Sequence, residues 1–194
     1  MNRYLRELIP YLVTSVLFIA AGTYLGIITT IYIPTTADAV RAGIGEFAKM
    51  FFGLPRLHLA LAIFGNNAVK VLTVIIFGIL FGVWPVLFLL LNGYVLGMVI
   101  YLSVASEGTL ASVLGILPHG LFELPAVLLG TSIGLRLGTR AAGRLFGRRE
   151  ASLTGELLRA LKFFFLVIVP LLLLAAFIEA FVTPSVYSWF SLRA

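Results

Sequence analysis

The stretch FFFLVIVPLLLLAAFIEAFV, residues 163–182, holds 20 residues and one charged side chain, Glu179. An α-helix rises about 1.5 Å per residue, so this stretch is long enough to cross the roughly 30 Å hydrocarbon core of a bilayer. The rest of the chain has the same character, because 61% of its 194 residues are hydrophobic and 11% are charged. A soluble domain is about one quarter charged. The sequence therefore predicts an integral membrane protein.

Five segments are apolar and long enough to span a membrane. We expect them at residues 8–33, 58–80, 84–104, 110–135 and 163–182. The short connections between the second, third and fourth segments predict antiparallel neighbours. The fold class is thus all-α, a polytopic membrane protein with a single integral membrane domain over residues 1–194.

The basic residues predict the orientation. With a cytoplasmic N-terminus, nine of the 14 Lys and Arg residues fall inside, mostly in the basic segment 136–162. Cytoplasmic loops carry this excess of positive charge. We therefore expect a multi-pass protein of the cell membrane, with its N-terminus in the cytoplasm and its C-terminus external. Tyr187, Trp189 and Phe190 would lie at the outer interface, where aromatic residues gather.

Residues 37–52 predict an amphipathic outer helix, with Thr36 as its N-cap. Val40, Ile44 and Phe47 recur at helical spacing, while charged residues fall between them. Such a helix either lies on the outer membrane surface or packs its apolar side on the spanning helices.

Glycines recur one helical turn apart in four of the spans. The pairs are Gly22/Gly26, Gly78/Gly82, Gly93/Gly97, Gly130/Gly134 and Gly134/Gly138. This GxxxG pattern lets helix backbones approach closely in lipid. It indicates either close packing within one chain or a homo-oligomer interface, for which the first span is the candidate.

The fourth segment carries His119 and Glu123 at membrane depth, where ionisable groups are expensive and mark functional sites. The two residues are four apart and share one face of a continuous helix. Pro118 and Pro125 flank them and predict that the helix is kinked or interrupted there (a helix break).

Other polar side chains in the spans reach a similar depth by helical rise. The predicted intramembrane polar cluster is Asn66, Asn67, Lys70, Asn92, His119, Glu123 and Glu179, the last nearer the outer end. We expect Lys70 to pair with Glu123 between the second and fourth spans. The cluster either sets the helix register or holds a ligand, an ion or a proton.

Catalysis is not expected. The chain has no cysteine and two histidines, so a thiolate site and a His-Glu-x-x-His zinc motif are excluded. A metal site of His119, Glu123 and Glu179 fits poorly, because Glu179 lies near the outer end of its span. We expect no catalytic residue, no metal and no cofactor, and no nucleic-acid partner.

Five arginines follow the fourth span: Arg136, Arg140, Arg144, Arg148 and Arg149. Most are four residues apart, so a continuing helix carries them as a basic stripe. The stripe fits ordinary topology anchoring, contact with anionic membrane lipids, or an acidic protein partner.

Four motifs match one family. They are Phe64-Gly65-Asn66-Asn67, Asn92-Gly93 with Gly97, His119-Gly120 followed by Glu123-Leu124-Pro125-Ala126, and Ile178-Glu179-Ala180-Phe181-Val182-Thr183-Pro184. On these motifs the chain resembles the stage II sporulation protein M family, over nearly its whole length.

The resemblance implies a five-span protein without known catalytic activity. In spore formers the family member looks like a scaffold that holds two cell-wall hydrolases at the septal membrane. The family also occurs in organisms that never sporulate, so sporulation itself is not implied. Five residues match its characteristic polar positions: Asn67, Asn92, His119, Glu123 and Glu179.

We therefore expect a non-catalytic membrane scaffold that assembles or recruits protein partners. The alternative is a transporter-like protein that moves a small solute, ion or lipid through a polar site at the midplane. Broken helices beside polar groups are typical of transport sites.

Overall fold

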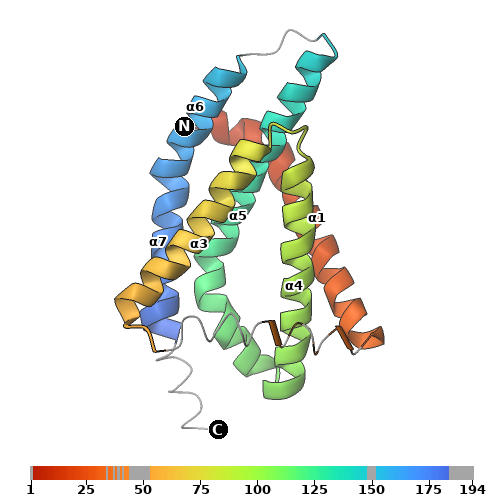
Figure 1. Cartoon of the computed structure of the whole chain (residues 1–194), viewed down its shortest axis with the longest axis vertical. Coiled ribbons are helices and arrows are strands. Elements are labelled where there is room, and N and C mark those ends of the chain that lie inside the picture. The colour runs from red at the N-terminus through yellow and green to blue at the C-terminus, as the bar shows by residue number, and fades with distance from the viewer. Residues whose placement is uncertain are drawn as a thin grey trace.

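The computed structural model describes residues 2–33, 35, 36, 38, 40, 42, 43, 53–147 and 152–183. In this part of the chain the elements are α1 (Asn2–Tyr32), α3 (Arg56–Phe77), α4 (Val83–Glu107), α5 (Thr109–Leu145), α6 (Leu153–Phe163), η1 (Phe164–Ile168), α7 (Val169–Phe177) and η2 (Ile178–Val182). The two η segments are π-helical turns that continue the helix from α6 to α7 and beyond. Figure 1 shows the resulting upright bundle.

Within the described residues, five helices are long and apolar enough to cross a membrane, which confirms the predicted fold class. These spans are Tyr4–Tyr32, Arg56–Phe77, Val83–Ser106, Gly120–Leu145 and Leu153–Val182. The last helix begins ahead of residue 163 because Ser152 caps α6, its hydroxyl oxygen accepting from the backbone N–H of Gly155. The predicted outer helix at 37–52 and the aromatic residues 187–190 lie largely or wholly outside the described residues.

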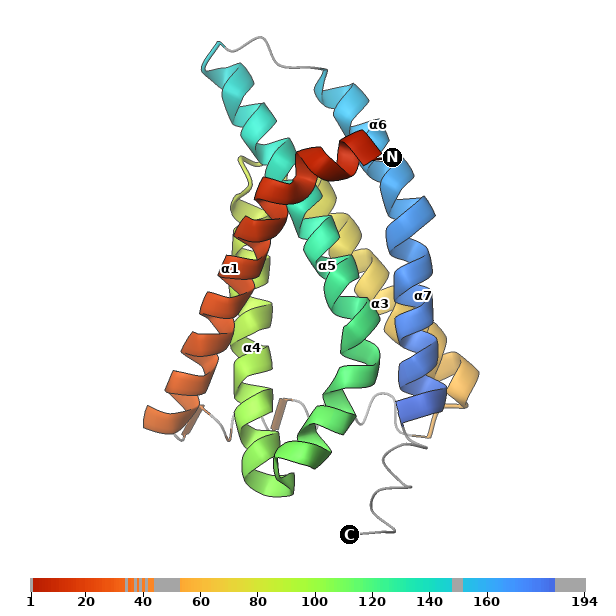
Figure 2. The same ribbon diagram turned by 180° about the vertical axis from the view of Figure 1, so that it is seen from behind.

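Of the two effects predicted for Pro118 and Pro125, interruption of the helix is wrong, because α5 runs continuously from Thr109 to Leu145, whereas a kink agrees with its bent shape (Figure 2). Figure 2 shows that its lower half bends away from its upper half. A proline removes one backbone donor and pushes on the preceding turn, which bends a long helix when the flanking turns hold.

The helices form two parallel pairs that meet at glycines. In the first pair, α1 and α4 run in the same direction (Figures 1 and 2). A methyl group added at Gly22 or Gly26 of α1 would overlap backbone atoms of α4, and one at Gly93 or Gly97 would overlap backbone atoms of α1. The backbones are therefore in direct contact, as small-residue motifs permit in lipid.

The second pair, α3 and α5, is also joined at glycines, which on the α3 side lie in the turn that follows the helix. Gly78 lies against Gly134, and Gly138 lies against Gly78 and Gly82. In the structure these glycines pack closely against other helices of the same chain. The contacts also leave the first span's glycines unavailable for a homo-oligomer, because α4 covers Gly22 and Gly26.

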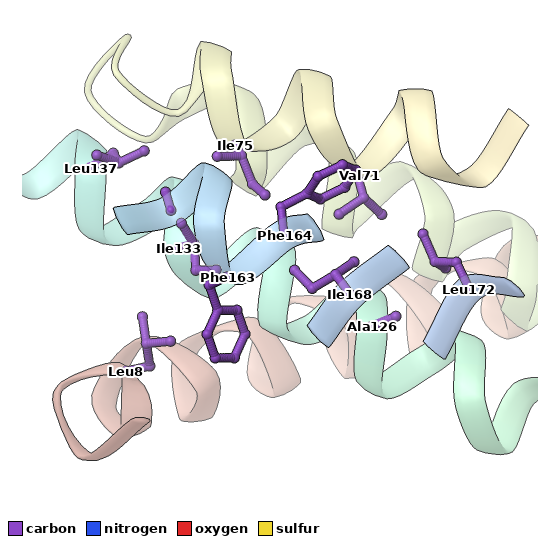
Figure 3. Packing of buried hydrophobic residues seen from close by; sticks show 11 residues of the cluster. Leu8, Val71, Ile75, Ala126, Ile133, Leu137, Phe163, Phe164, Ile168 and Leu172 are labelled. Carbon is purple, nitrogen blue, oxygen red and sulfur yellow. The ribbon is translucent and has the colours of Figure 1, made fainter. Parts of the chain in front are cut away.

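An apolar core lies where α3, α5 and the last helix meet the start of α1. Its fully buried members include Leu8, Val71, Ile133, Phe164 and Ile168 (Figure 3). Val71 packs on Gly130, and Ile168 reaches the same glycine from α7's side of the bundle. This core fixes the relative height of α3 and α5, which decides where their polar residues lie.

Candidate functional site

The expected pairing of Lys70 with Glu123 is not formed. Lys70 is exposed and makes no ion pair within the described part of the chain, whereas Glu123 is half-buried in α5. The reason is the register of the two helices. Val71 lies against Gly130, so Lys70 is level with the residues near 129, about 9 Å along the helix from Glu123.

The other predicted cluster residues are also dispersed. Asn66 donates its side-chain amide to the Oδ1 of Asn67, at 3.3 Å, within α3. Asn92 is exposed on α4 and donates to the carbonyl oxygen of Phe88, one turn earlier in the same helix. The side-chain amides of Asn66 and Asn92 each donate to an acceptor in their own helix, so they do not form a shared polar centre.

Glu179, the remaining cluster residue whose side chain is described, lies apart as well. Glu179 is half-buried in η2 at the far end of the last helix. The side chains of Pro118 and His119 fall outside those that the structure describes. Among the described residues, no group of three or more His, Cys, Asp or Glu side chains is placed to hold a metal ion.

The structure places a buried polar centre elsewhere, at the end of the bundle where α1 begins. Arg136 of α5 is 3% exposed, and its Nη2 atom forms an ion pair and a hydrogen bond with Oε2 of Glu7 on α1. The same Nη2 lies 3.3 Å from Oε2 of Glu156 on α6, which is 4% exposed. One guanidinium thus joins three helices.

Two further arginines approach Glu156 through its other oxygen. Arg140 Nη1 lies at 3.4 Å and Arg159 Nη1 at 3.5 Å from Oε1. Arg159 is 69% exposed, so its pair contributes little. We call Glu7, Arg136, Arg140 and Glu156 the Arg136 cluster.

Aromatic rings and the start of α6 support this cluster. The centroid of the Tyr4 ring lies 4.8 Å from the guanidinium carbon of Arg136. The same ring packs on Phe163, with ring centroids 5.5 Å apart. Glu156 stands in the first turn of α6, where the helix dipole favours a carboxylate. Among the described residues, Nη1 of Arg136 is buried without a hydrogen-bond partner.

A row of hydroxyl contacts continues from the cluster between α1 and α5. The Tyr11 and Thr139 hydroxyls lie 2.9 Å apart. Deeper in the bundle, the buried hydroxyls of Ser15 and Ser132 lie 3.3 Å apart, and Thr131 donates to Ser15 at 3.2 Å. The α1–α5 contact is therefore polar along its upper length, whereas the α1–α4 contact is made of glycines.

For Arg136 the expected contact with lipid or a protein partner is wrong, because the side chain is buried and paired within the chain. Arg140 is only partly accessible, and Arg144 is exposed. Arg148 and Arg149 lie outside the described residues.

Sequence reasoning missed Tyr4, Glu7 and Glu156. One signal was available: Glu7 and Glu156 are acidic residues in strongly basic segments, at the same predicted membrane boundary as Arg136. Opposite charges at the same depth are candidates for pairing.

The profile of the family described as Stage II sporulation protein M matches residues 15–184. The chain belongs to this family. The match includes the second to fifth spans and most of the first. Arg136 and Glu156 lie within the family match, whereas Glu7 precedes it.

Two similar proteins come from Methanocaldococcus jannaschii. Uncharacterized protein MJ0793 is 30% identical over 126 residues, which cover 64% of this chain and 71% of the relative. Uncharacterized protein MJ0706 is 33% identical over 90 residues, 46% of this chain and 38% of that relative. No solved structure matches the chain.

Proposed function

We propose that this family member is a non-catalytic membrane scaffold that assembles or recruits partner proteins. The observation that carries the proposal is backbone contact at glycines, between α1 and α4 and between α5 and the turn that follows α3. Closely packed interiors resist deformation. Helices held in this way keep their outer faces in constant relative positions, which is what a recruiting surface needs.

The Arg136 cluster supports the same function. It ties the start of α1 to α5 and α6 through buried, charge-assisted contacts. The end of the bundle that carries most of the arginines is therefore held in one arrangement. A scaffold role also agrees with what the family resemblance implies.

We further propose that the protein lies in the cell membrane with its N-terminus in the cytoplasm and its C-terminus outside. The uneven distribution of Lys and Arg residues supports this orientation. In this orientation the Arg136 cluster and the exposed Arg144 and Arg159 lie at the cytoplasmic end.

A second candidate function is the movement of a small solute, ion or lipid. It is favoured by the last helix, in which two π-helical turns interrupt regular α-helix and one of them contains the half-buried Glu179. Such turns are frequent at functional sites. The half-buried Glu123 of α5 is a second carboxylate, outside the Arg136 cluster, that such movement would use.

Flux measurements on liposomes that contain the purified protein separate the two functions. We expect proton, sodium and potassium flux, and lipid scrambling, to equal those of protein-free liposomes. In parallel, mild solubilisation of native membranes should yield a protein partner at a constant ratio to the chain.

Protein-dependent flux that Glu123→Gln abolishes, and that Asp38→Asn leaves intact, would overturn the scaffold proposal. Asp38 is a suitable control because it is exposed and precedes the second span. The loss of a carboxylate at membrane depth is thereby compared with the loss of one at the surface.

A further inference from the structure

We propose that the facing sides of α3 and α4 bind a transmembrane helix of another protein, one that carries an acidic residue, and that Lys70 pairs with its carboxylate. The inference rests on the proposed scaffold function and names the chemistry of a partner. The surface, which we call the α3–α4 face, consists of Lys70, Thr73 and Phe77 on α3 and Trp84, Asn92 and Val95 on α4.

The two helix sides meet in a ring contact beside the turn. Phe77 and Trp84 meet edge to face, with ring centroids 6.3 Å apart. Residues three, four and seven apart share a helix side, so Lys70 and Thr73 lie on the side of α3 that Phe77 presents to α4. Asn92 follows Trp84 by two steps of four residues and lies about 80° from it around α4, on the same exposed half of the helix.

Lys70 and Asn92 also lie at the same depth. Lys70 precedes Phe77 by seven residues, and Asn92 follows Trp84 by eight, distances of about 10 and 12 Å along the helices. Figure 1 shows α3 and α4 diverging below the turn that joins them, with α5 behind. Both polar side chains remain exposed in this diverging region.

The surroundings of Lys70 favour an anionic partner. It lies within a helix that is long and apolar enough to span the membrane, it is exposed, and it makes no ion pair with any described residue. Ionisable side chains at this depth normally pair or face a cavity. The Cα–Cβ bonds of a helix tilt toward its N-terminus, so Lys70 leans away from the nearer end of α3. That lean opposes snorkelling to the nearer interface.

The depth favours a protein carboxylate over a lipid phosphate. Headgroup phosphates lie at the membrane interface, whereas Lys70 lies about 10 Å below the end of α3. A helix that crosses the bilayer beside α3 and α4 brings an acidic side chain directly to this level. Its apolar surface would cover the exposed Val95, and its hydrogen-bonding groups would meet Asn92 and Thr73.

The test uses the full-length protein in phosphatidylcholine nanodiscs and synthetic 24-residue Leu/Ala transmembrane peptides. One peptide carries a single Glu seven residues from one end, and its match carries Gln. Because the chain has no cysteine, Leu145→Cys gives one site for a donor dye, and energy transfer to a labelled peptide reports binding. Leu145 is exposed at the end of α5.

We expect the Glu peptide to bind about 3- to 30-fold more tightly than the Gln peptide, the range of polar contacts between membrane helices. Lys70→Met should remove this preference. The exposed Lys162→Met, on α6, should retain it. In Lys70→Glu the preference should transfer to a peptide with Lys at the same position. A gain of binding to the Lys peptide cannot result from a damaged fold.

Equal binding of the Glu and Gln peptides to the wild-type protein would overturn the inference. So would a preference that Lys70→Met leaves unchanged. Energy transfer between two labelled copies that Lys70→Met abolishes would identify self-association instead, and binding that follows the content of anionic lipid would identify a lipid. If a native partner co-purifies equally with wild type and Lys70→Met, the scaffold function is retained but the inference about Lys70 on the α3–α4 face is overturned. Flux through the purified protein would overturn the scaffold function alone.

Discussion

Arg136 has a different role in the structure from the one that its sequence context predicts. In the sequence it begins a row of arginines typical of a cytoplasmic membrane boundary. In the fold its guanidinium is buried between Glu7 and Glu156 and covered by Tyr4. Breaking a buried ion pair by removing one partner leaves an uncompensated charge, which is the costly case.

We predict that Arg136→Leu lowers the free energy of unfolding by about 3–5 kcal/mol, because it leaves two carboxylates without their shared partner. Unfolding by SDS in mixed micelles measures the change. The matched substitution Arg144→Leu, at an exposed position of the same helix, should change stability by less than about 0.5 kcal/mol. Equal effects of the two substitutions would contradict a special role for Arg136.

A second prediction concerns the hydroxyls between α1 and α5. Ser15 and Ser132 are both buried and lie within hydrogen-bond distance. A double-mutant cycle of Ser15→Ala and Ser132→Ala should give a coupling free energy of about 0.6 kcal/mol, the average for such contacts in membranes. Unfolding in micelles supplies the four free energies, and strictly additive effects would exclude coupling.

At the scale of elements, glycine position decides which helices pair. Helix association in lipid lacks the hydrophobic drive of water and depends on close packing. The glycines of α1 match those of α4, and Gly78 and Gly82, in the turn that follows α3, match those of α5. The sequence pattern predicted small-residue contacts, whereas the partners emerge only when the helices are placed side by side.

We predict that Gly26→Ala destabilises the protein by about 1–3 kcal/mol, the range for overpacking. The added methyl would lie well inside 3.0 Å of the Tyr94 carbonyl oxygen on α4, and backbone cannot move aside as a side chain can. Micelle unfolding measures the loss.

Gly65→Ala is the control, because a methyl at this helical glycine meets nothing within 4 Å. Alanine is the better helix former by about 1 kcal/mol, so this change should be neutral or stabilising. If both alanines destabilise alike, glycine acts through chain flexibility and not through contact between α1 and α4.

At the scale of the whole molecule, the ends of the bundle differ in charge and the proposed orientation follows from that difference. The absence of native cysteine allows single thiols to report it. Leu54 precedes α3, whereas Leu80 lies in the turn between α3 and α4 and Phe146 follows α5; all three are exposed.

We predict that a membrane-impermeant maleimide labels Leu54→Cys in intact cells. Leu80→Cys and Phe146→Cys should react only after the membrane is permeabilised. The reverse pattern would place the N-terminus outside and invert the assignment of the Arg136 cluster to the cytoplasm.

The sequence by itself determined the membrane class, the five spans and the glycine motifs, because these depend on composition and on spacing within single helices. It also marked Lys70 and Glu123 as polar residues at depth. Whether these two residues pair depends on the relative height of α3 and α5 along the bundle. The contact of Val71 with Gly130 sets this height and keeps the two residues apart. The Arg136 cluster joins residues more than 120 positions apart in α1 and α5. Only tertiary structure decided these contacts, because helical periodicity specifies which face a residue occupies, whereas interhelical packing specifies what that face meets.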